Sequence, residues 1–173
     1  MIRPIAVVDT DVLLLLLDTA DAPDIQRRKS YVELTIENLE KQKARFVVPT
    51  PVIAELCRGG PGSDVVREIA QRLLGRLRIE VLDEDAAVLA GEISRTTLQR
   101  REGRERGAVK YDALIAGIAH RMGARWLLTG NGEDHRKGFA VLNSAVEVVV
   151  ATEPPTRGQQ VLVDLVKPAG RSK

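Results

Sequence analysis

Two aspartates follow a short apolar run near the start of the chain. Residues 5–17 read IAVVDTDVLLLLL, with Asp9 and Asp11 on either side of Thr10. An aspartate in such a place can attack a phosphate as a nucleophile while its neighbour acts as a general acid. It can equally serve as one of several carboxylates that hold a divalent metal ion. The positions of the other acids and lysines decide between these two chemistries.

Three further segments each place a carboxylate just after an expected strand or at the start of a helix. Glu55 lies on the helix after the second strand, Asp112 opens a helix rich in alanine and isoleucine, and Asp134 follows the fourth strand. Ligands of parallel sheets bind beyond the carboxyl ends of the strands, so we expect these acids to share one edge with Asp9. Carboxylates gathered there repel one another unless a cation neutralises them, and hard oxygen ligands select Mg²⁺ or Mn²⁺. The sequence therefore favours a metal site over a lone nucleophile.

Each acid also has a structural explanation, which the sequence leaves open. Asp112 can favour the positive end of its helix, and Asp134 can cap a short helix. Asp11 can be a first-turn helix acid, and Glu55 can be a solvated helix residue. We interpret His135, next to the last acid, as an exposed loop histidine.

The apolar pattern predicts strands that alternate with helices. Short β-branched runs indicate buried strands, whereas amphipathic stretches indicate helices. This alternation predicts an α/β fold, a three-layer α/β/α sandwich around a central, mostly parallel five-stranded sheet. We expect one domain over residues 1–151 and a tail over 152–173 that begins near a proline pair. The predicted strands are 4–9, 45–49, 78–83, 124–130 and 145–151, and the predicted helices are 24–44, 51–59, 62–77, 84–102 and 108–123.

The composition is that of an ordinary globular protein. The 173 residues include 44% hydrophobic and 29% charged residues, and the formal net charge is only +2. Cys57 is the single cysteine, so the sequence has no disulfide framework, which favours a reducing cytoplasm. The apolar run at 12–17 is too short to span a membrane. We expect a cytoplasmic protein with no membrane partner.

Four stretches together resemble the PIN-domain nucleases, and in particular the VapC-type toxins of toxin–antitoxin pairs. The resemblance covers roughly residues 5–150. Its most specific part is an acid that opens an Ala/Ile-rich helix, a Gly-Ala turn, and a strand that ends Thr-x-Asn-x-x-Asp. His135 stands where an aromatic residue commonly follows the last acid in this family. The four stretches are VVDTDVLL, VVPTPVIAELCRG, KYDALIAGIAHRMGARWLLTGNGED and VEVVVA.

The resemblance implies a role for each acid of the expected site. The chain would be a metal-dependent endoribonuclease that hydrolyses RNA phosphodiesters with Mg²⁺ or Mn²⁺. Three neighbouring residues would orient the carboxylates, namely Asp11, Thr129 and Asn131. The acidic quartet would be Asp9, Glu55, Asp112 and Asp134, with Asp9, Asp112 and Asp134 as metal ligands.

The same resemblance implies partners. A type II toxin has a small antitoxin, which we expect to place an arginine or lysine among the carboxylates. VapC-type proteins usually form homodimers, and the apolar positions within 31–39 and 62–77 are plausible contact surfaces. The basic segment RREGRERG at 100–107 is close in sequence to Asp112, so we expect Arg104 and Arg106 to bind the RNA substrate.

Two other functions remain as alternatives. A haloacid-dehalogenase-type phosphatase would use Asp9 as its nucleophile, with Thr50 and Lys110 as supporting groups. That assignment leaves Glu55 and Asp112 without a role. A non-catalytic nucleic-acid-binding PIN module would keep the acids and act by association alone.

Overall fold

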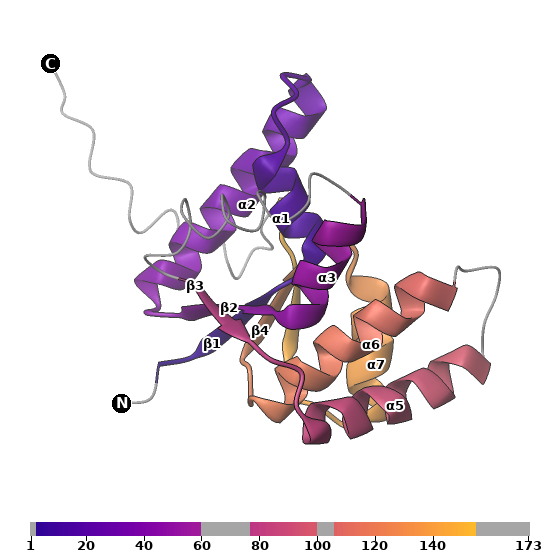
Figure 1. Cartoon of the computed structure of the whole chain (residues 1–173). Coiled ribbons are helices and arrows are strands. Elements are labelled where there is room, and N and C mark those ends of the chain that lie inside the picture. Colours follow the sequence, from indigo (N-terminus) through magenta and orange to yellow (C-terminus); the bar gives the residue numbers. More distant parts are fainter. Residues whose placement is uncertain (1–2, 60–76, 100–105, 155–173) are drawn as a thin grey trace, which may run out of the picture.

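The computed structural model describes residues 3–59, 77–99 and 106–154 (Figure 1). All but the last residue of the predicted helix 62–77 lies outside these ranges, as does most of the predicted tail. The domain boundary at residue 151 therefore stays a prediction. No helix of the described part is long and apolar enough to cross a membrane.

A five-stranded sheet forms the centre of the molecule, in the order β3-β2-β1-β4-β5. Every neighbouring pair is parallel, so the predicted mostly parallel sheet is confirmed and is parallel throughout. The central strands are buried on both faces, which explains their continuous apolar sequences. The strands are β1 (Ile5–Val8), β2 (Arg45–Pro49), β3 (Leu77–Glu80), β4 (Trp126–Thr129) and β5 (Glu147–Val150).

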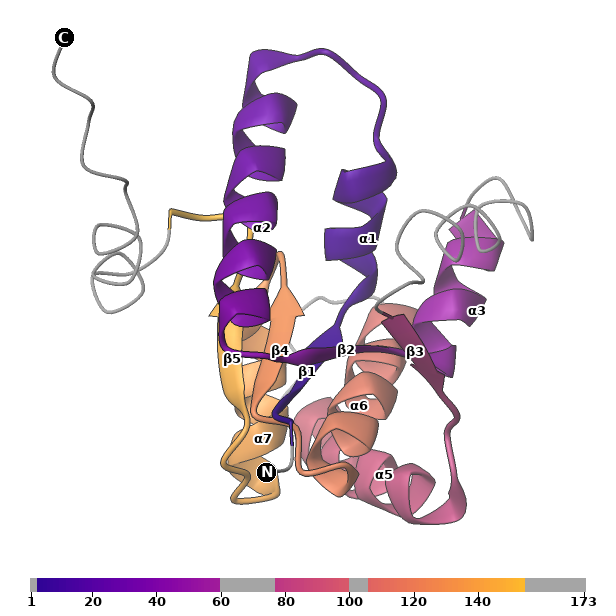
Figure 2. The same ribbon diagram turned by 90° about the vertical axis from the view of Figure 1, so that its left-hand side faces the viewer.

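Helices cover the sheet on both sides, which confirms the predicted three layers. Figure 1 shows α2 on one side and α5, α6 and α7 packed together on the other. Figure 2 shows β1 leading into α1, which stands beside α2. The described helices are α1 (Thr10–Leu17), α2 (Pro23–Lys41), α3 (Thr50–Gly59), α5 (Glu84–Gln99), α6 (Arg106–Arg121) and α7 (Gly132–Val141).

The helices α1 and α6 differ from the sequence prediction, and α7 was expected only as a short helix that Asp134 could cap. The helix α1 was not predicted as a separate element, because five consecutive leucines at 13–17 show no polar face and hence no helical period. In the structure Val12, Leu13 and Leu15 are buried, whereas Leu14 is 50% exposed. The helix α6 begins two residues before the predicted start at 108, so Asp112 lies more than one turn inside it.

The order of the strands places a topological switch point between β1 and β4. The chain moves outward from β1 to β2 and β3, and then returns to form β4 on the opposite side of β1. Connections therefore leave the carboxyl ends of β1 and β4 in opposite directions. Open parallel sheets bind ligands in the crevice at this point. Asp9 follows β1 directly, and Thr129 is the last residue of β4.

The closest helix pair, α5 and α6, meets at a glycine. A Cβ atom on Gly117 of α6 would lie 2.5 Å from the carbonyl oxygen of Ala86 and 3.1 Å from the backbone nitrogen of Ala90. Gly91, on the exposed face of α5, has no atom within 4 Å of the corresponding position. The first glycine is therefore required by packing, and the second is not.

We expect the two alanine substitutions to change stability in opposite directions. Gly117→Ala forces the two helices apart and should lower the free energy of unfolding by about 1–3 kcal/mol. Gly91→Ala improves helix propensity without a clash and should raise it by up to about 1 kcal/mol. Urea unfolding followed by circular dichroism measures both. A Gly117→Ala variant as stable as the unaltered chain would contradict the close packing.

Candidate active site

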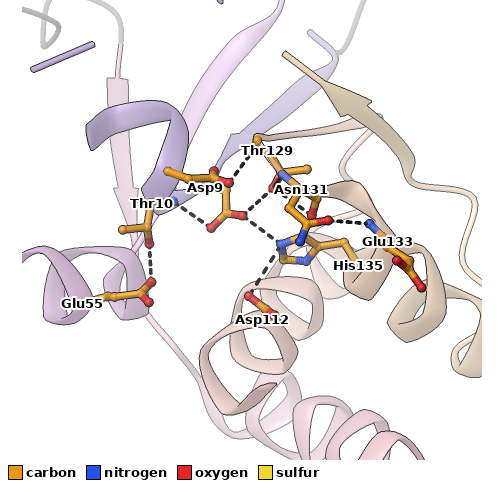
Figure 3. Close-up of polar contacts among 10 residues, drawn as sticks. Asp9, Thr10, Glu55, Asp112, Thr129, Asn131, Glu133 and His135 are labelled. Carbon is orange, nitrogen blue, oxygen red and sulfur yellow. Dashed lines mark hydrogen bonds and ion pairs between the residues drawn. The ribbon is translucent and has the colours of Figure 1, made fainter. Parts of the chain in front are cut away.

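Asp9 is the residue around which the other polar side chains of the site are arranged. It is the N-cap of α1, and its backbone N–H continues the β1–β4 pairing by donating to Leu128. The carboxylate is buried and accepts three hydrogen bonds (Figure 3). Thr10 N–H donates to Oδ1 at 2.7 Å, while the Thr129 hydroxyl and His135 Nε2 each lie 2.8 Å from Oδ2. Asp9 is thus held from α1, β4 and α7 at once.

These contacts determine the charge of Asp9. Burial alone would raise the pKa of its carboxyl group. The hydrogen bond and positive charge of His135 act in the opposite direction, together with the hydrogen bonds from Thr129 and Thr10. The net result is a pKa below the usual value. Asp9 is therefore an ionised carboxylate in the interior of the protein.

His135 was interpreted from the sequence as an exposed loop histidine, and this was wrong. It lies in α7 with 2% of its surface exposed. Burial alone would lower its pKa, but the hydrogen bond and charge of Asp9, with Asp112 as a further contributor, raise it overall. The helical spacing of the buried residues Gly132, His135, Gly138 and Phe139 is the signal that could have placed it inside.

Asp112 faces the same cluster from α6. Its Oδ1 atom lies 3.9 Å from His135 Nε2. Burial raises the pKa of Asp112 from its usual value of 3.8 to about 6; His135 opposes this, whereas the negative charges of Asp9, Glu55 and Asp11 add to it. Since Asp112 lies inside α6, the alternative explanation by the positive end of its helix does not apply. Ionisation of Asp112 is costly in this place because the side chain is largely buried and because other carboxylates are near.

Glu55 reaches the site from α3 through a threonine that the sequence analysis did not single out. The hydroxyl of Thr10 donates to Glu55 Oε2 at 2.5 Å. Thr10 is buried and Glu55 is half-buried, so the alternative of a fully solvated glutamate does not hold. Figure 3 shows Glu55 and Asp112 on either side of the region below Asp9.

Asp11 connects the start of α1 to the loop after β4. Its Oδ2 atom accepts the backbone N–H of Gly130 at 2.8 Å. A Cβ atom on Gly130 would lie 2.6 Å from that oxygen, so the contact requires a glycine. The Oδ1 atom is buried and has no hydrogen-bond partner among the described residues. Burial and the charge of Asp9 raise the pKa of Asp11.

The other predicted site residues occupy different places. Asn131 is the N-cap of α7, and its side chain accepts the backbone N–H of Glu133 at 3.4 Å. Asp134 is half-buried in the first turn of α7. His135, the next residue of α7, lies close to both Asp9 and Asp112. Arg104 lies outside the described residues, and of Arg106 only its place at the start of α6 is described.

The architecture matches solved structures over most of the chain. VapBC-1 from nontypeable Haemophilus influenzae has a TM-score of 0.56 at 20% sequence identity, covering 86% of this chain and 99% of that chain. VapBC2 from Rickettsia felis, bound to a DNA fragment from its promoter, has a TM-score of 0.55 at 20% identity, covering 84% and 98%. VapBC from Salmonella typhimurium, bound to DNA, has a TM-score of 0.52 at 19% identity, covering 86% and 98%. No protein-family model and no curated protein matches this sequence.

The chain has a PIN-like fold. At these identities the likeness concerns the fold, and it confirms the architecture that the sequence resemblance implied. The PIN-like sheet brings Asp9, Asp11 and Thr129 to the switch point, and α3 and α6 bring Glu55 and Asp112 beside them.

The donor set of the PIN-like site suits a hard divalent cation. Its oxygen atoms belong to carboxylates, and the pKa values of Asp112 and Asp11 are raised by burial and further by neighbouring negative charges. A cation would relieve the repulsion between these charges. The buried, unpartnered Oδ1 of Asp11 is a further sign of uncompensated negative charge. As they are placed, the described residues contain no group of three His, Cys, Asp or Glu side chains that could hold one ion together. Binding an ion with three protein ligands would therefore require side chains to rotate.

We expect Asp112→Asn to stabilise the metal-free protein at neutral pH. Because the folded-state pKa of about 6 lies above the usual 3.8, ionisation of Asp112 costs stability as the pH rises through this interval. Removing the charge should raise the free energy of unfolding by on the order of 1–3 kcal/mol near pH 8, and by almost nothing near pH 4.

Thermal unfolding in the presence of EDTA at both pH values measures this difference. Glu92→Gln, on an exposed position of α5, is the matched control and should change the melting temperature little at either pH. Equal effects of Asp112→Asn at the two pH values would contradict the assigned cause.

Proposed function

We propose that this chain is a metal-dependent endoribonuclease. The observation that carries the proposal is the ionised Asp9, buried at the switch point of a PIN-like sheet, with Asp112 and Glu55 beside it. One carboxylate is kept charged in the interior, and the one beside it is costly to ionise. A divalent cation would neutralise the charge of both. Perturbed pKa values of this kind cluster at functional sites.

Each residue of the proposed site would have its own role. Asp9 and Asp112 would hold Mg²⁺ or Mn²⁺, with Asp134 as a further ligand from α7. When bound, such an ion would polarise the phosphodiester and lower the pKa of a water molecule. Thr129 orients the Asp9 carboxylate, and Thr10 orients Glu55 through its hydroxyl. Glu55, held by Thr10, would be the group that accepts a proton from the attacking water.

The cellular role that fits this chemistry is the toxin of a type II toxin–antitoxin pair. The solved structures with this fold include VapBC proteins bound to DNA. A small antitoxin would neutralise the acidic cluster with an arginine, whose planar fork matches carboxylates. A homodimer, RNA as substrate and a cytoplasmic location complete the proposal.

The phosphatase alternative has less support in the geometry. Its threonine would be Thr50, whose hydroxyl accepts the backbone N–H of Leu82 at 3.1 Å. The acids Glu55 and Asp112 would have no function in that chemistry.

We expect Asp9→Asn and Asp112→Asn each to reduce RNA cleavage at least about tenfold, which corresponds to about 1.4 kcal/mol in the barrier. The assay uses the purified full chain, single-stranded RNA and Mn²⁺ or Mg²⁺, with EDTA as the negative condition. Asp24→Asn, at an exposed position of α2, is the matched control and should keep full activity. Full activity in Asp9→Asn would contradict the site assignment. Absence of cleavage by the unaltered chain with both metals would leave a nucleic-acid-binding module on a PIN-like fold.

The basic segment 100–107 gives a separate expectation for RNA binding. Changing Arg104 and Arg106 to Glu should weaken RNA affinity and flatten its dependence on salt, because fewer counterions are released. Fluorescence anisotropy with labelled RNA at several salt concentrations measures both. The control makes the same charge change at Arg27 and Arg28, two exposed positions of α2. Equal effects of the two double variants would show that net charge alone is responsible.

A further inference from the structure

The two oxygens of the Asp9 carboxylate are bonded unequally. Oδ2 lies 2.8 Å from both the Thr129 hydroxyl and His135 Nε2. Oδ1 accepts the Thr10 backbone N–H at 2.7 Å. A carboxylate oxygen has about two lone pairs in its plane. The two side-chain donors therefore use the capacity of Oδ2, while Oδ1 keeps one lone pair for another partner.

The surroundings of the imidazole ring indicate that its Nε2 atom carries a proton. His135 Nδ1 is buried and has no hydrogen-bond partner among the described residues. A proton on Nε2, by contrast, meets the acceptor Asp9 Oδ2 directly. A metal-ligating histidine usually donates its other N–H to an acceptor, and Nδ1 has none here. The ring is therefore suited to donate to Asp9 and poorly suited to bind an ion itself.

We propose that His135 is a positioning residue for the metal site. Its Nε2–H fixes Oδ2 of Asp9, so that Oδ1 is the oxygen that binds the divalent cation. Nε2 of the same ring lies 3.9 Å from Oδ1 of Asp112, the second acid proposed to hold the ion. This inference rests on the proposed function, since it concerns the ion that the function requires.

His135 can position Asp9 because the helix that carries it, α7, is itself held in place. The helix is anchored by its N-cap Asn131 and by the buried residues Gly138 and Phe139. The ring therefore has a defined place, and its hydrogen bond holds Asp9 in one orientation. Loss of such an outer partner of a metal ligand typically costs about 10–100-fold in metal affinity or activity.

The experiment measures Mn²⁺ binding to the full chain by calorimetry, independently of RNA cleavage. His135→Phe keeps a ring but removes the donor, and we expect a loss of affinity of at least about tenfold. In His135→Gln, the amide nitrogen takes the place of Nε2, and affinity should stay within about threefold of the unaltered chain. His135→Asn, whose shorter amide corresponds to Nδ1, should behave like the phenylalanine variant. His120→Gln, at the other end of α6 from the site, is the control and should bind Mn²⁺ normally.

Each other outcome has a definite meaning. Unchanged affinity in both His135→Phe and His135→Asn would reduce the histidine to a packing residue, and tighter binding would show that the ring competes with the ion. Nitrogen coupling to bound Mn²⁺ in electron spin echo spectra would identify His135 as a ligand; all three results overturn the inference. Thermal unfolding of the metal-free variants confirms that each is folded. If the unaltered chain binds no Mn²⁺, the proposed function itself fails, and the inference fails with it.

Discussion

The buried negative charge of Asp9 is the constraint on which the rest of the site depends. A carboxylate without partners would be too costly in the interior, and burial of this kind is tolerated only with good hydrogen bonds. Here the donors come from the first residue of α1, the last residue of β4 and the second turn of α7. These hydrogen bonds therefore fix where α1 begins, where β4 ends and where α7 lies. The positions of α1, β4 and α7 are thus coupled through one side chain.

Two close approaches at glycine residues support this arrangement. The loop after β4 can approach Asp11 only because residue 130 is glycine, and α6 can approach α5 only because residue 117 is glycine. The first contact holds the loop that leads to α7. The second sets how close α6, which bears Asp112, lies to α5. Residues without side chains thus determine where the charged side chains lie. Protein interiors transmit such adjustments because they are close-packed.

The sheet and most of the helices could be predicted from the sequence, because buried parallel strands and amphipathic helices have distinct apolar patterns. The place of Asp9 could also be predicted, since an acid directly after a buried strand lies at the edge of the sheet. The contact of His135 with Asp9 and the contact of Thr10 with Glu55 could not, because both depend on which side chains from distant segments meet. The helix α1 was not predicted because leucines surround it on all sides, so its sequence shows no polar face.

Two of the three hydrogen bonds to Asp9 join residues that are 120 and 126 positions apart in the chain. Contacts between such distant residues form late, because a long loop must close before they contribute. During synthesis, a ribosome-bound chain that has released β1 and α1 still lacks both Thr129 and His135. The acidic cluster therefore cannot assemble until the segment through α7 has emerged. A nascent or truncated chain that ends before this point contains most of the acids but not the site.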